Sequence, residues 1–112
     1  MNLIFTTHDV QLAPDVRTYA EEKVQRLDRH FDRIVDARLE FELESGRGSD
    51  PPKAVKLLVR VSGAVLTART TARDLRTAVD QVVDKMDHQL RRRKERLVEH
   101  RPAPVVPEVE PG

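Results

Sequence analysis

Hydrophobic residues in the C-terminal third of the chain recur every three or four positions, which places them on one face of an α-helix. These positions are Leu75, Ala78, Val79, Val82, Met86, Leu90 and Leu97. A second stripe of the same spacing follows Pro14, a residue type that suits the first position of a helix. It consists of Val16, Ala20, Val24, Leu27 and Phe31. The pattern therefore predicts two amphipathic helices, one over residues 72–100 and one from Pro14 to about residues 30–33.

Between the two helical stripes, hydrophobic residues alternate with polar ones, which is the period of a strand with one buried face. The clearest run covers residues 35–44, where the inward positions are Val35, Ala37, Leu39, Phe41 and Leu43. Similar runs cover residues 53–62 and 65–71 on either side of Gly63, which predicts a tight hairpin. Residues 2–7 form a shorter strand candidate. Residues 45–52 are rich in glycine, serine and proline, and we expect a flexible loop there.

The predicted element order is β-α-β-β-β-α. A right-handed crossover through the first helix makes the first two strands parallel, and hairpins make the other neighbours antiparallel. The predicted fold class is α+β, a two-layer sandwich with both helices packed on one face of a four-stranded mixed sheet. The chain of 112 residues has room for one such domain, over residues 1–100. Residues 101–112 hold four of the seven prolines and are expected to form a disordered, proline-rich acidic tail.

Composition excludes several classes of function. The chain has no cysteine, which rules out disulfides, thiol catalysis and cysteine-ligated metal sites. No hydrophobic run approaches the roughly 18–20 residues that span a bilayer, and the N-terminus lacks the pattern of a secretory signal. The histidines (His8, His30, His88 and His100) lack metal-ligand spacing. No phosphate-binding glycine motif or nucleophile motif is present. We therefore expect a cytoplasmic protein, monomeric when free, that is not an enzyme and has no cofactor, metal, membrane contact or small-molecule substrate.

Positive charge is concentrated near the C-terminal end of the second helix. Residues 85–96 include six basic and two acidic residues, although the whole chain carries a net charge of only +1. Helical geometry puts one set of basic side chains on a single flank, namely Lys85, His88, Arg92 and Arg96. On the first helix the basic flank consists of Lys23, Arg26, His30 and Arg33. In a two-layer sandwich these two flanks are expected to meet in one patch.

This charge has two interpretations. Cations at the C-terminal end of a helix stabilise the helix dipole, and charged runs are commonly no more than a solvated face. The four consecutive cations of residues 91–94 exceed what capping requires, which favours a surface that binds a polyanion such as RNA. Arg93 falls almost on the hydrophobic axis of the helix, so we expect the helix to have left the core by that residue and to project into solvent.

Asp80, Asp84 and Asp87 lie on the side of the second helix opposite its basic flank. A catalytic pair of carboxylates requires a concave hydrophobic pocket, which this pattern does not predict. We expect instead a solvated acidic face with local partners, such as Arg76 paired with Asp80 one turn later.

Two helical segments in this topology resemble a known family. They are RTYAEEKVQRL at residues 17–27, with FDRI at 31–34, and DLRTAVD at 74–80, leading into DKMDHQLRRRKER at 84–96. They resemble the short hibernation promoting factors, which belong to the bacterial ribosome-associated inhibitor family, also called sigma-54 modulation proteins. The resemblance covers residues 1 to about 100.

The resemblance implies a protein that binds the small ribosomal subunit and its rRNA in the decoding region. It implies that the protein occupies the space of mRNA and tRNA and holds ribosomes idle in stationary phase or stress. In that family basic residues of both helices contact RNA. With the adjacent cations of the run, the expected RNA-binding residues are Lys23, Arg26, Lys85, His88, Arg91, Arg92, Arg93, Lys94 and Arg96.

The chain departs from the family pattern at two positions. The family usually has an aromatic residue at the place of Arg76, so we expect weaker packing near the start of the second helix. It usually has Arg or Lys at the place of His88, whose ordinary pKa near 6.5 is expected to weaken one phosphate contact. The C-terminal dimerisation domain of the long family members is also absent, so ribosome pairing through that domain is not expected.

Two other functions remain open from the residues. One is a protein–protein adaptor whose basic C-terminal helix docks on an acidic partner. The other is a free-standing double-stranded RNA binder, although the acidic strand end at Glu40, Glu42 and Glu44 does not supply the basic loops of that class. An adaptor is expected to keep its partner after nuclease treatment, whereas an RNA binder is expected to lose it.

Overall fold

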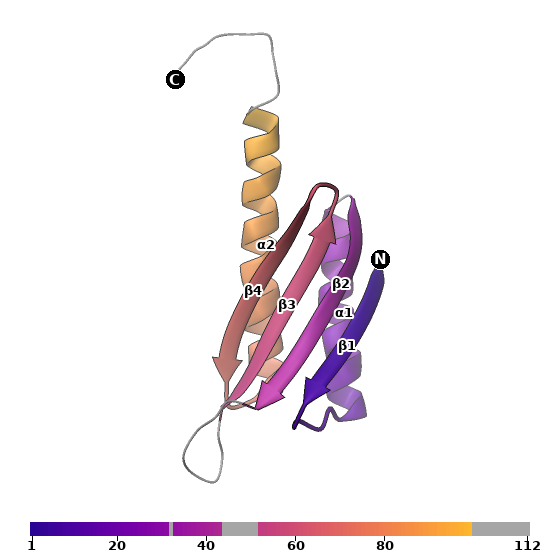
Figure 1. The fold of residues 1–112 in the computed structure, drawn as a ribbon, viewed down its shortest axis with the longest axis vertical. Coiled ribbons are helices and arrows are strands. Elements are labelled where there is room, and N and C mark those ends of the chain that lie inside the picture. The colour runs from indigo at the N-terminus through magenta and orange to yellow at the C-terminus, as the bar shows by residue number, and fades with distance from the viewer. Residues whose placement is uncertain (32, 44–51, 100–112) are drawn as a thin grey trace.

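The computed structural model describes residues 1–31, 33–43 and 52–99, with side chains described up to residue 96 in the last range. Figure 1 shows six elements in the order β1 (Asn2–His8), α1 (Pro14–His30), β2 (Ile34–Leu43), β3 (Lys53–Val61), β4 (Ala64–Ala72) and α2 (Leu75–Glu99). This order confirms the predicted β-α-β-β-β-α arrangement. The expected tail at residues 101–112 lies outside the described residues, as does the expected loop except for Pro52.

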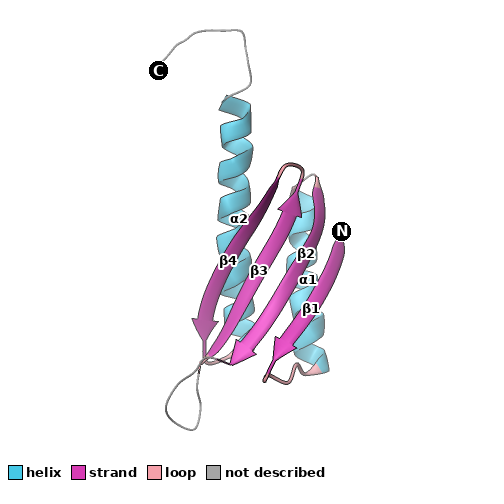
Figure 2. Ribbon diagram, in the orientation of Figure 1, coloured by secondary structure: helices cyan, strands magenta, loops and turns pink. Residues whose placement is uncertain are grey.

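The four strands form one sheet in the order β1-β2-β3-β4. β1 pairs with β2 in parallel, and the β2–β3 and β3–β4 pairs are antiparallel. Both helices lie on the same face of this sheet (Figure 2). The predicted two-layer α+β fold is therefore confirmed, and its parallel pair follows from the crossover through α1.

The core lies between the sheet and the helices. Both helices contribute the stripes that the spacing predicted, and Val24, Val79, Val82 and Met86 are fully buried. From the sheet the largest fully buried side chains are Phe41, Leu39, Leu57, Val55 and Val59. The alternation along β3 therefore places its hydrophobic side chains against the helices, as its period of two requires.

Two inward positions predicted for β2 are wrong. Val35 is 51% exposed, and Ile34 is buried in its place. The register of β2 against β3 shifts between Ile34 and Asp36, and such an irregularity changes the side of the sheet to which a residue points. Leu43 is 39% exposed at the end of the strand.

α2 begins at Leu75, three residues later than predicted, because Asp74 caps it. The Asp74 carboxylate accepts hydrogen bonds from the Thr77 backbone N–H at 3.1 Å and from the Thr77 hydroxyl at 3.0 Å. An aspartate in this position satisfies a free N–H group of the first helical turn. At its other end α2 extends beyond the turn between β3 and β4 (Figure 1).

Candidate nucleic-acid interface

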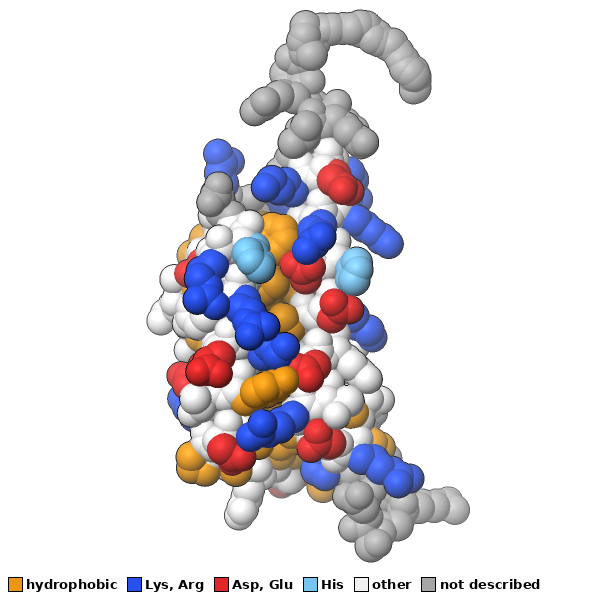
Figure 3. Space-filling model, turned by 180° about the vertical axis from the view of Figure 1, so that it is seen from behind, with side chains coloured by type: hydrophobic (Ala, Val, Ile, Leu, Met, Phe, Trp, Pro, Cys, Tyr) orange, Lys and Arg blue, Asp and Glu red, His pale blue; other side chains and the backbone are white. Residues whose placement is uncertain are grey.

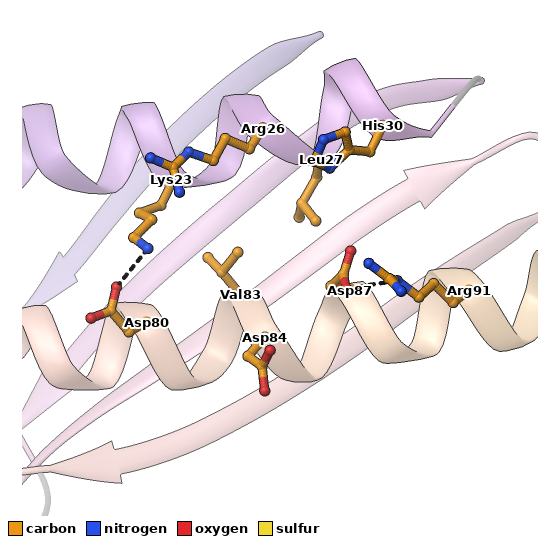
Figure 4. A pocket seen from close by; sticks show the side chains of 9 residues that line it. All are labelled: Lys23, Arg26, Leu27, His30, Asp80, Val83, Asp84, Asp87 and Arg91. Carbon is orange, nitrogen blue, oxygen red and sulfur yellow. Dashed lines mark ion pairs between the residues drawn. The ribbon is translucent and has the colours of Figure 1, made fainter.

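A shallow groove separates α1 and α2 on the helical face of the molecule. It is an open hollow of about 200 Å³ in which Leu27 and Val83 supply hydrophobic lining. The polar lining consists of Lys23, Arg26, His30, Asp80, Asp84, Asp87 and Arg91. Figure 4 shows that the cations on one side come from α1 and the carboxylates on the other side from α2.

The expectation that the basic flanks of the two helices meet is wrong for most of their length. The side of α2 that faces α1 is acidic, and Lys23 forms an ion pair with Asp80 at 3.2 Å. Arg91 is the cation of α2 that lines the groove, and its Nε lies 2.9 Å from Asp87. The opposite flank of α2 turns toward β4, where Lys85 contacts the backbone. Helical periodicity gives the angle between two stripes, but it does not say which of them faces the neighbouring helix.

Tyr19 connects the two helices near the start of α2. Its hydroxyl donates a hydrogen bond of 2.6 Å to Asp80. This bond is the main reason why the pKa of Tyr19 is raised above its ordinary value, and desolvation is the second. Lys23 lies 5.7 Å and Arg76 lies 5.0 Å from the centre of its ring, distances at which a cation is attracted to an aromatic face. No sequence pattern indicates this polar role of Tyr19.

The spacing of Arg76 and Asp80 predicted an ion pair between them, but Arg76 pairs with Asp15 instead. Its guanidinium donates a hydrogen bond of 2.9 Å to Asp15 at the start of α1, which lowers the pKa of the Asp15 carboxyl. Because Arg76 also covers the Tyr19 ring, the packing that we expected this position to lose is partly supplied by its own side chain.

The remaining predicted RNA-binding residues fall into two groups. Lys85, which is exposed, and the half-buried Arg93 turn back toward the sheet and donate hydrogen bonds to backbone carbonyls. His88, Arg91, Arg92, Lys94 and Arg96 are exposed on α2. The Nδ1 atom of His88 lies 2.9 Å from the Asp84 carbonyl oxygen, so this ring is oriented by the preceding turn. As expected, α2 has left the hydrophobic core by Arg93, since Leu90 is the last buried residue among its described side chains. The Arg93 side chain itself is half-buried and donates a hydrogen bond of 3.2 Å to the Ser62 carbonyl oxygen.

Residues 91–96, which we call the α2 extension, present the densest group of exposed cations on the described part of the molecule. Their exposed cationic side chains belong to Arg91, Arg92, Lys94 and Arg96. Figure 3 shows Lys and Arg side chains along the upper part of this helix and across the groove on α1, with carboxylates between them. The arrangement fits contact with a polyanion by a projecting helix and leaves the groove itself mixed in charge.

Within the described residues, no group of three or more His, Asp or Glu side chains is placed to hold a metal ion. Over the same residues, neither helix combines the length and hydrophobicity that crossing a membrane requires.

Comparison with known proteins gives concordant results. The family model described as "Sigma 54 modulation protein / S30EA ribosomal protein" matches residues 3–98. A ribosome hibernation promoting factor from Azotobacter vinelandii is 32% identical over 99 residues, which cover 88% of each chain. A ribosome hibernation promotion factor from Deinococcus radiodurans is 33% identical over 93 residues, and here the match covers 83% of this chain and 49% of the relative.

Two solved structures share the fold. A ribosomal subunit interface protein from Coxiella burnetii superimposes with a TM-score of 0.74 at 24% identity, over 85% of this chain and 99% of the other. The N-terminal domain of Thermus thermophilus Protein Y gives a TM-score of 0.70 at 25% identity, over 82% of this chain and 98% of the other.

Proposed function

The chain belongs to the sigma 54 modulation protein / S30EA ribosomal protein family, and on this premise we propose that it is a ribosome hibernation factor. It binds the small ribosomal subunit near the decoding region, through basic side chains on α1 and α2. There it blocks translation by occupying the space that mRNA and tRNA need. The relatives named as ribosome hibernation factors support the role, and the cations of the α2 extension support RNA as the ligand.

The proposed interface binds RNA by its shape and its phosphates. The candidate contacts are Lys23 and Arg26 on α1, with His88 and the exposed cations of the α2 extension on α2. An arginine guanidinium forms paired hydrogen bonds with phosphate oxygens, which suits Arg91, Arg92 and Arg96 to this task. Such contacts release counterions, so affinity falls steeply as salt rises. Specificity then comes from the way in which folded rRNA places its phosphates against a projecting helix.

Co-sedimentation with purified ribosomal subunits tests this proposal. We expect the unmodified protein to migrate with the small subunit at low salt and to dissociate as salt rises. The double variant Arg92→Glu/Lys94→Glu is expected to stay at the top of the gradient. Its matched control is Arg38→Glu/Lys56→Glu, which makes the same change of net charge on the open face of the sheet. These positions alternate with the buried Leu39 and Leu57.

The control is expected to sediment like the unmodified protein. Loss of binding by both double variants to the same degree would mean that binding follows net charge and not the α2 extension. Failure of the unmodified protein to sediment with the small subunit at low salt would contradict the proposed function itself.

A protein–protein adaptor remains the second candidate, because the same exposed cations of the α2 extension fit an acidic protein surface. Nuclease treatment of the bound fraction separates the two. A hibernation factor is released when its RNA is digested, whereas an adaptor stays with its partner.

A further inference from the structure

Among the strands that the structure describes, β4 lies at one edge of the sheet, and no other described strand pairs with its outer side. α2 runs along this edge and directs one polar side chain from each successive turn at β4 or at the turn before it. We call these side chains the edge ladder. They belong to Gln81, Lys85, Gln89 and Arg93.

The two central side chains of the edge ladder, Lys85 and Gln89, donate hydrogen bonds to backbone carbonyls of β4. The Lys85 ammonium donates to the Arg69 carbonyl oxygen at 2.9 Å, and the Gln89 side-chain amide donates to the Thr67 carbonyl oxygen at 2.8 Å. The pair Val61–Ala64 closes the hairpin. In an antiparallel pair of strands, residues whose N–H and C=O groups point at the partner strand alternate with residues whose groups point away from it. Counted from Ala64, the carbonyls of Thr67 and Arg69 point away from β3. These are therefore edge carbonyls that α2 satisfies in place of a fifth strand.

The outer rungs extend the ladder in both directions. Toward the start of α2, the Thr70 hydroxyl donates to the Gln81 side-chain oxygen at 2.8 Å. At the other end, the Arg93 guanidinium donates to the Ser62 carbonyl oxygen in the turn between β3 and β4. The guanidinium also packs on this turn, because a Cβ added to Gly63 would lie 3.7 Å from Arg93 Nη2.

The repeat follows from the dimensions of the two elements. Four residues of helix rise by about 6 Å, and two residues of strand by about 6.8 Å. A step of four along α2 therefore matches the step of two along β4 between the two central contacts, from Arg69 to Thr67, in the opposite direction. A straight helix can form the same contact at consecutive turns, and the contacts fix its direction relative to the sheet.

We propose that Lys85, Gln89 and Arg93 are positioning residues of the ribosome-binding surface. They hold α2 along the edge of β4 and so set the direction in which the α2 extension projects, while the exposed cations of the extension bind the phosphates. Two residues that the sequence assigned to RNA contact, Lys85 and Arg93, thereby receive a different role. This inference rests on the proposed function above.

A matched pair of variants at Lys85 separates positioning from phosphate binding. Lys85→Gln and Lys85→Met remove the same charge, but only the glutamine keeps a donor, and Gln89 shows that a glutamine can reach β4 from α2. For Lys85→Met we expect about a three- to tenfold loss of ribosome affinity at every salt concentration, because one hydrogen bond is lost. Lys85→Gln is expected to bind like the unmodified protein.

The slope of log affinity against log salt is the second readout. Each lost phosphate contact reduces its magnitude by about 0.7–0.9. We expect unchanged slopes for both Lys85 variants and a reduced slope for Arg92→Met. Gln89 gives an independent test because its side chain is uncharged. Gln89→Leu should weaken ribosome binding without changing the slope. Its control, Gln25→Leu on the exposed side of α1, should have no effect.

Equal reductions of the slope by Lys85→Gln and Lys85→Met would overturn the inference and make Lys85 a phosphate ligand. Full affinity of Gln89→Leu would also overturn it. If the unmodified protein fails to bind ribosomes, the proposed function is contradicted. Thermal unfolding then tests whether the edge ladder holds α2 against β4. A Tm for Lys85→Met below that of Lys85→Gln supports the ladder, and equal Tm values contradict it.

Discussion

The Tyr19 hydroxyl on α1 and the Asp80 carboxylate on α2 form a hydrogen bond of 2.6 Å across 61 positions of sequence. The carboxylate also accepts the Lys23 ammonium at 3.2 Å. One acidic side chain of α2 thus connects two neighbouring turns of α1. This contact fixes the spacing of the helices that carry the proposed RNA-binding residues, at the end of the groove away from the α2 extension.

We expect Tyr19→Phe to lower the Tm, because Asp80 loses a donor while the ring keeps its packing. In a protein that already carries Asp80→Ala, which removes the acceptor, the same substitution should have a smaller effect, because the two residues act as a pair. A double-mutant cycle measured by thermal unfolding checks this. Additive effects of the two substitutions would show that the hydrogen bond does not contribute to stability.

The same bond predicts a dependence on alkaline pH. Folding raises the pKa of Tyr19, so the stabilisation is fully present below the ordinary pKa of about 10 and is lost as the pH rises through the raised value. Tyr19 is the only tyrosine and the chain has no tryptophan, so phenolate absorbance reports this residue alone. We expect its midpoint above that of the Asp80→Asn variant. Equal midpoints would contradict the assignment.

The core prediction concerns Met86, which is fully buried at the centre of α2. Met86→Ala should lower the free energy of unfolding by about 2–5 kcal/mol, because hydrophobic contacts are lost and a cavity remains. Val65 on β4 is 58% exposed, and Val65→Ala should change it by less than about 0.5 kcal/mol. Chemical denaturation measures both. A cost of Val65→Ala equal to that of Met86→Ala would contradict the placement of the core.

The cap of α2 predicts a dependence on acidic pH. The hydrogen bond from the Thr77 backbone N–H lowers the pKa of the Asp74 carboxyl most, and the bond from the Thr77 hydroxyl lowers it further. The stabilisation by the charged form is therefore present above the ordinary pKa of about 4 and is lost as the pH falls through the lowered value. Asp74→Ala should lower the Tm at neutral pH, and the difference from the unmodified protein should shrink as the pH falls through the lowered pKa. A constant difference would exclude the charge as its source.

The sequence predicted the fold because most of the elements carry a clear period. The stripes of α1 and α2 and the alternation of β3 each specify one buried face, and only one layer arrangement buries all of them. The exceptions are Val35, whose place in the alternation is changed by an irregularity of the register that the sequence does not indicate, and Leu43, which ends its strand.

The candidate site was less accessible to sequence reasoning. Helical geometry correctly separated the basic and acidic stripes of α2, but the orientation of the helix on the sheet turned the acidic stripe toward α1. Arg76 and Arg93 found partners far away in sequence, Asp15 and Ser62, which no local spacing indicates. An arginine that holds two elements together and an arginine that faces a ligand cannot be distinguished in the sequence. Only the tertiary contacts distinguish them.

The central claim is that the protein excludes mRNA from the small subunit by means of the α2 extension. Its most direct test is the release of labelled mRNA from purified small subunits as the protein is added. We predict displacement by the unmodified protein and by Arg38→Glu/Lys56→Glu at the same concentration, and none by Arg92→Glu/Lys94→Glu. Labelled mRNA that stays bound to subunits saturated with the unmodified protein would contradict the claim.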